Sequence, residues 1–385
     1  MARAVAGGLA LGFAVGWNVA NTGSAAGPLS DAYGVPLAAI GLLTTALFVT
    51  HFASQIPGGG FVDRIGARRV GLGAAVVIAA GNALALAAAS FPLGVLARLL
   101  AGIGTGLGFV AGSDYVRAAT ASPAVQGLYG GAAVGGGGAA IAIVPLLPGW
   151  RAPYATAAVV AFGLGLVLVA APRDERHERR ERPAVSSVVR DRRLYPLAAL
   201  HTASFALSVI AGNWIVDLLE DDGHSRGVAG AVGALILLLG LPTRPLGGWV
   251  LRTRPPLPAR VLAGSVIAGA GGMALLALHL PFPVLMAASA VSGLAAGVPF
   301  AAAVSGAQGV RADAPGAAVG LVNAVATLVI VAGTPLLGLT FSLPGDGRIG
   351  FALLAVLWLS SLPTVRYAAG LLVRQGDNQS ADRAT

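Results

Sequence analysis

The sequence predicts an all-α integral membrane protein with about twelve transmembrane helices in two six-helix bundles. Three observations support this fold class. Apolar residues make up 56% of the 385 residues and charged residues 11%, against roughly 25% in a soluble domain. The chain divides into about twelve apolar runs of the length, about 20 residues, that crosses a bilayer core. A short polar motif also recurs in the two halves of the chain, as in secondary transporters built from internal repeats.

Each predicted span is an apolar run of helix length that ends at a short polar connection. The runs lie near residues 6–27, 37–58, 70–89, 93–113, 125–147, 153–171, 195–218, 228–250, 259–279, 284–308, 316–341 and 349–372. Residues 172–194 are the one long polar segment, and their near-balanced charge and flanking prolines favour a solvated connector over a regulatory site. We therefore expect an N-terminal six-helix bundle (1–171), a cytoplasmic linker (172–194), a C-terminal six-helix bundle (195–373) and a cytoplasmic tail (374–385).

The distribution of positive charge predicts the orientation. All 25 basic residues are Arg, and 20 of them fall in the termini or in the loops on one side of the predicted spans. Only Arg151, Arg226 and Arg348 lie in loops on the other side, which leaves Arg98 and Arg244 inside spans. By the positive-inside rule both termini are cytoplasmic, and we expect a multi-pass protein of the inner (cytoplasmic) membrane.

Other classes that the composition could suggest are not favoured. The net charge of +9 is not accompanied by a basic patch interleaved with aromatic residues, so no nucleic-acid partner is expected. The first run resembles a secretory signal, with Ser24-Ala25-Ala26 as a cleavage site. Cleavage there would leave an odd number of spans and would not explain Asn18 and Asn21 within the run.

A polar motif at residues 59–69 reads Gly-Gly-Phe-Val-Asp-Arg-Ile-Gly-Ala-Arg-Arg, and residues 245–252 repeat its first half, pairing with residues 57–64. In the repeat, Leu251 stands where Asp63 would be. A carboxylate at the end of a span can pair with guanidinium groups or with the N-terminus of a neighbouring helix. Such a contact can close one face of the protein and can be broken again.

The chain resembles the major facilitator superfamily, whose loop between spans two and three carries this pattern, here filled by Gly59, Asp63, Arg64, Gly66, Arg68 and Arg69. The resemblance implies a conformational latch that stabilises the outward-open state, formed by Asp63, Arg64 and Arg68 with Gly59 and Gly66. An orientation signal alone is the alternative for Arg69. The family's span-four pattern is matched by Arg98, Gly102, Gly104 and Gly106. The family's drug-antiporter branch places a Gly-Pro pair inside span five, which this chain lacks.

Polar side chains inside spans are costly and commonly functional, so the few present are candidates for substrate or coupling-ion contacts. They are Asn18, Asn21, His51, Gln55, Arg98, His201 and Arg244. Arg244 precedes Pro245-Leu246-Gly247-Gly248, which resembles the nitrate/nitrite and cyanate porters of the superfamily. Those nitrate porters carry a second Arg on span two, where this chain has His51 and Gln55. The alternatives are hydrogen bonds to neighbouring helices, structural pairing for Arg98, and an orientation role for Arg244.

The sequence therefore predicts a transporter of a small solute, of the small or organic anion class, by secondary active or facilitative alternating access. With no carboxylate at mid-span, a coupled proton would be carried by His51 or His201, because the unperturbed pKa of His is about 6.5. The alternatives are proton-coupled efflux of drugs or amphiphiles, or a receptor or scaffold without transport. We expect no catalytic site, cofactor or metal site, a monomer, and the solute and the lipid bilayer as partners.

Overall fold

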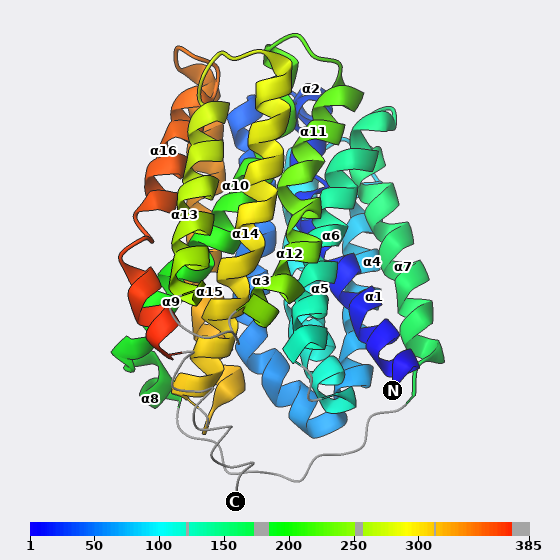
Figure 1. The fold of residues 1–385 in the computed structure, drawn as a ribbon. Coiled ribbons are helices and arrows are strands. Elements are labelled where there is room, and N and C mark those ends of the chain that lie inside the picture. Colours follow the sequence, from blue (N-terminus) through cyan, green and yellow to red (C-terminus); the bar gives the residue numbers. More distant parts are fainter. Residues whose placement is uncertain (121–122, 173–184, 251–256, 312, 372–385) are drawn as a thin grey trace, which may run out of the picture.

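The computed structural model describes residues 1–120, 123–172, 185–250, 257–311 and 313–371. The regular structure in these ranges is helical, without a strand. Within the described residues, ten helices are long and apolar enough to cross a membrane, and two bent helix pairs raise the number to as many as twelve. The predicted all-α membrane fold is confirmed. Figure 1 shows the helices running side by side, with the start of the chain at the lower end of the bundle.

The first half of the chain forms seven helices that make six spans. They are α1 (Ala2–Ala20), α2 (Ala26–Tyr33), α3 (Leu37–Ile65), α4 (Ala67–Ala85), α5 (Phe91–Ala119), α6 (Pro123–Ile143) and α7 (Ala152–Ala170). The first span is bent by 46° between α1 and the segment Gly23–Tyr33. Helix α1 packs against α5, α6 and α7, and α4 packs against α5 and α7.

The second half contains more interruptions. Its helices are α8 (Val185–Val189), α9 (Tyr195–His201), α10 (Leu207–Asp221), α11 (Arg226–Leu238), α12 (Gly240–Val250), α13 (Leu257–Leu276), α14 (Phe282–Val310), α15 (Pro315–Leu339) and α16 (Arg348–Leu359). A π-helical turn at Thr202–Ala206 joins α9 to α10 within the seventh predicted span. The eighth span is interrupted between α11 and α12, just before Pro242. The last span is bent by 47° between α16 and Thr364–Leu371.

Contacts between the halves are made mainly by five helices. Helix α3 packs against α15, and α6 packs against α11 and α12. The predicted division of the chain into bundles, linker and tail stays a prediction. Residues 173–184 of the predicted linker and the whole predicted tail lie outside the described residues, while α8 adds a short helix near the end of that linker.

Candidate functional site

A small cavity lies at the centre of the molecule, where helices of both halves meet. The space in it that is open to the centres of water molecules is about 30 Å³, more than the roughly 10–15 Å³ that one water needs. Most of its lining is apolar, with aromatic rings from both halves. The polar side chains that line it are those of His51, His201, Arg244 and Asn323. The structure therefore brings together three of the candidates chosen from the sequence.

Close contact between α3 and α5 places His51 at the cavity. A Cβ at Gly102 or Gly106 of α5 would overlap the backbone of α3, so glycine at both positions permits the approach. His51 Nδ1 lies 3.0 Å from Oγ1 of Thr105 on α5. That hydroxyl donates to the carbonyl of Gly102 over 3.0 Å, so it accepts the hydrogen bond from His51. His51 is therefore a buried side chain held in one orientation.

His201 ends α9 at the start of the π-helical turn. Its ring stacks on Phe205, with centroids 5.4 Å apart, and lies at a tilt 5.4 Å from the ring of Phe300 on α14. Its Nε2 lies 3.2 Å from Oδ1 of Asn323 on α15. Its Nδ1 is buried and has no hydrogen-bond partner among the described residues. One face of the imidazole is thus fixed by packing and one nitrogen remains unsatisfied.

Arg244 lies on α12, within a turn that contains Pro242 and Pro245. Its side chain is buried and lines the cavity, with Cζ 3.8 Å from the ring centroid of Phe300. Its Nη1 donates a hydrogen bond to the carbonyl of Gly130 on α6, across the two halves. No carboxylate pairs with it in the part of the chain that the structure describes, and its Nε has no partner there. Among the residues that the structure describes, its guanidinium contacts a carbonyl dipole and an aromatic face.

Asn18, Asn21 and Arg98 form a separate network inside the first half. Arg98 Nε donates to the Leu43 carbonyl over 3.4 Å, Nη1 to Oδ1 of Asn21 over 3.2 Å, and Nη2 to the Asn18 carbonyl over 2.5 Å. Asn82 donates to Oδ1 of Asn18 over 2.7 Å. None of these side chains lines the central cavity. The arrangement joins α1, α3, α4 and α5 and supports the structural reading of Arg98.

The latch residues lie at the end of the bundle where α1 begins. The side chain of Asp63 lies outside the described residues, and so does the side-chain environment of Gly59. Gly66 ends α3 with φ of 91°, a backbone conformation that favours glycine. Arg64 is exposed, and Arg68 donates to the carbonyls of Leu168 and Val169 at the end of α7 over 3.1 and 2.5 Å.

Gln55, the remaining candidate, does not line the cavity. It lies on α3 one turn beyond His51 and is buried, and its Nε2 has no partner within the ranges described. The predicted His51 and Gln55 pair therefore does not act on the cavity as a unit. The aromatic ring of Phe109 on α5 lies beside His51 and lines the cavity.

At the opposite end from the latch, hydrogen bonds join α3 to the second half. Thr44 Oγ1 donates to Oδ1 of Asn213 on α10 over 3.0 Å. Thr45 Oγ1 donates to the Val331 carbonyl on α15 over 2.8 Å. These contacts hold the two halves together on that side of the cavity.

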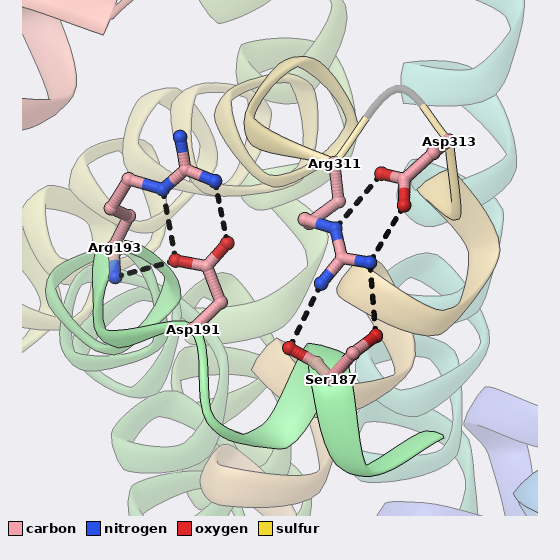
Figure 2. A network of polar contacts seen from close by, with 5 residues as sticks. All are labelled: Ser187, Asp191, Arg193, Arg311 and Asp313. Carbon is pink, nitrogen blue, oxygen red and sulfur yellow. Dashed lines mark hydrogen bonds and ion pairs between the residues drawn. The ribbon is translucent and has the colours of Figure 1, made fainter. Parts of the chain in front are cut away.

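A polar cluster in the second half connects α8 to the loop between α14 and α15 (Figure 2). Arg311 donates to both carboxylate oxygens of Asp313 over 2.8 and 2.7 Å, and to the carbonyl and hydroxyl of Ser187 over 2.9 and 3.1 Å. Beside it, Arg193 donates to Asp191 over 2.9 and 2.7 Å. These bonds lower the pKa of both carboxyl groups below their ordinary values, Asp313 through Arg311 and Asp191 through Arg193. The cluster lies away from the cavity and fixes the end of the connector.

Sequence reasoning missed three residues that the structure makes relevant. Asn323 and Phe300 line the cavity and hold His201 and Arg244. Asn323 could have been found, because it is a polar residue within an apolar span. Phe300 gave no signal, since aromatic residues are ordinary in spans. Asp217, near the end of α10, is buried, and its Oδ2 has no partner among the residues described.

The fold and the buried cavity between the halves indicate a multi-pass membrane protein of the transporter class. A family model of the Major Facilitator Superfamily matches residues 8–334. This match covers most of the chain, and the protein belongs to that superfamily of membrane transporters. A comparison with curated proteins finds no match.

Proposed function

We propose that this protein carries a small monovalent anion across the membrane by alternating access, with the central cavity as its binding site. In this proposal the protein lies in the inner (cytoplasmic) membrane, and both termini are on the cytoplasmic side. The observation that carries it is Arg244, a buried guanidinium that lines the cavity and has no carboxylate partner in the described ranges. A buried and incompletely paired charge is costly, and an anion in the cavity relieves that cost through charge-assisted hydrogen bonds.

The position of Arg244 between the halves also supports a role in transport. Its Nη1 contacts Gly130 of the first half, while its guanidinium packs on Phe300 of the second. An anion that binds here changes the balance of contacts across the boundary along which the halves would move. Differential contacts of this kind are what a ligand needs in order to shift a conformational equilibrium.

The small volume of the cavity favours a small solute over the drug-like or amphiphilic compounds of the rival proposal. With space of about 30 Å³ open to water centres, it has room for about two or three water molecules. Ligand pockets for drug-sized molecules are on the order of 300–1,000 Å³. The family match also favours transport over a receptor or scaffold without transport.

The latch is a further part of the proposal, with Asp63, Arg64 and Arg68 stabilising one end state of the cycle. The hydrogen bonds from Arg68 to the end of α7 support this role, because they already join the loop to another span. Asp63→Asn should then insert and fold but transport slowly, since it removes the charge and keeps the size. Wild-type turnover in the folded variant would reject the latch.

Uptake into proteoliposomes tests the proposed function. Purified protein is reconstituted, and uptake is measured for a panel of small anions and for neutral solutes of matched size, with and without an imposed pH gradient. We expect uptake of at least one small monovalent anion above that of empty vesicles, and none of the neutral solutes. Uptake of neutral or cationic solutes alone would contradict the assignment.

A further inference from the structure

The second half presents two unsatisfied hydrogen-bonding atoms at one wall of the cavity. Nε of Arg244 and Nδ1 of His201 are both buried without a partner among the described residues. Both side chains pack on the same ring, with Arg244 Cζ 3.8 Å and the His201 centroid 5.4 Å from the centroid of Phe300. Phe300 thus packs against both side chains, and all three residues line the cavity.

The contact with Asn323 fixes the chemical character of the imidazole nitrogen. Nε2 of His201 lies 3.2 Å from Oδ1 of Asn323, and an amide oxygen only accepts hydrogen bonds. Nε2 therefore carries the hydrogen. A neutral imidazole has a single N–H, so Nδ1 keeps its lone pair and is an acceptor. The neighbouring guanidinium favours this neutral form, because a second positive charge there would be repelled.

The wall thus combines one positively charged donor with one neutral acceptor. An anion that offers only acceptor atoms satisfies Arg244 and leaves the lone pair of His201 facing another lone pair. A site built around a polar group discriminates against an analogue that leaves that group unpaired. His51 is held by Thr105 through its own Nδ1 and packs near Phe109, so it belongs to a different wall.

We propose that the cavity selects small monoanions that carry their own hydrogen-bond donor next to the anionic group, such as protonated oxyanions and short hydroxy carboxylates. In this arrangement the anionic oxygen accepts from Arg244, and the O–H of the solute donates to Nδ1 of His201. The inference rests on the proposed function, because it takes Arg244 as the anion-binding group. It adds a specificity-determining role for His201, with Asn323 as the residue that positions it.

Hydrogen carbonate and nitrate make a matched pair of probes, because both are small planar monoanions and only the first has an O–H. Their affinities for purified protein are measured by calorimetry at mildly alkaline pH, where hydrogen carbonate predominates. Glycolate and acetate provide a second pair with the same contrast. We expect the donor-bearing anion of each pair to bind at least about tenfold more tightly.

Variants assign the preference to a residue. His201→Phe should abolish it without weakening nitrate or acetate, and His201→Gln should restore part of it, because its amide oxygen accepts a hydrogen bond. His51→Phe, with the same change on the other wall, should keep the preference. Monodisperse elution in detergent verifies that each variant is folded.

The outcomes separate this inference from the proposed function. Equal wild-type affinities within both pairs, or a preference that survives in folded His201→Phe, would overturn the selectivity proposal. If Arg244→Gln still weakened all four anions, the proposed anion site would stand. If none of the four anions bound, or if binding did not depend on Arg244, both proposals would fail.

Discussion

Arg98 and Arg244 are both buried guanidiniums inside membrane spans, one in each half, yet their surroundings differ. Each nitrogen of Arg98 that can donate has an oxygen partner, and the residue is away from the cavity. Within the described ranges, Arg244 has one carbonyl partner, an aromatic face and an Nε without a partner, and it lines the cavity. Burial of a charge in a span therefore does not by itself indicate a binding site. The degree to which its hydrogen bonds are satisfied is the more informative property.

The backbone around Arg98 is also more regular than the backbone around Arg244. Arg98 lies in the continuous helix α5, whose glycines let α3 pack closely. Arg244 follows the interruption between α11 and α12, and His201 precedes the π-helical turn. Local departures from α-helix free backbone groups and redirect side chains, and they are frequent at functional sites. The first half is thus the more regular wall of the cavity, and the second half carries the groups that are free to bind a solute.

The largest effect is expected for Arg98→Gln, which tests the structural side of the comparison. The change leaves oxygens in α1 and α3 without their donor, at a cost of roughly 1–3 kcal/mol for each buried acceptor. We expect a lower melting temperature in detergent and a smaller yield of folded protein. Arg244→Gln is the matched control, and it should melt close to the wild type. Equal melting of Arg98→Gln and wild type would mean that the network around Arg98 contributes little to stability.

Substitution of Arg244 tests the other side of the comparison. Arg244→Gln should weaken binding of a transported anion at least about tenfold, about 1.4 kcal/mol, because the charge is removed. Arg244→Lys should recover only part of the affinity, since Lys cannot present a planar fork of donors. Binding to the purified, folded variants is measured by calorimetry, with Arg98→Gln as a second reference. Unchanged affinity in Arg244→Gln would leave this residue a role in orientation or packing.

A comparison of His51 with His201 tests which half of the molecule carries a coupled proton. If His51 carries a coupled proton, His51→Gln should bind the anion but lose stimulation of uptake by a pH gradient. Glutamine can keep a hydrogen bond to Thr105 but does not titrate. His201→Gln is the parallel variant in the other half, and retention of stimulation there would assign the proton to His51. Uptake by wild type that ignores the gradient would remove the basis for a proton carrier at either position.

The sequence predicted the spans well because a bilayer imposes length and hydrophobicity on each helix separately. The run predicted near 93–113 is within α5, and that near 153–171 matches α7 within one residue. The sequence did not predict the bend after Ala20, the π-helical turn after His201 or the interruption before Pro242. These features depend on packing between helices. His51, His201 and Arg244 were chosen as costly polar residues, but their meeting at Phe300 or Phe109 could not be read from one sequence.

The smallest effect is expected where the two halves meet, at the hydrogen bond from Thr44 to Asn213. Thr44→Val keeps the shape of the side chain and removes this bond, which should destabilise the closed arrangement at that end by about 0.5–1.5 kcal/mol. Because the chain contains no Cys, a single Cys introduced at Ala26, which lines the same small pocket as Thr44 and Asn213, reports opening through its rate of labelling by a thiol reagent. We expect faster labelling in the Thr44→Val background.

Thr156→Val is the matched control. The described partners of the Thr156 hydroxyl are carbonyls of its own helix, so this variant should leave the rate unchanged. Equal labelling in both backgrounds would mean that this bond does not hold the halves together.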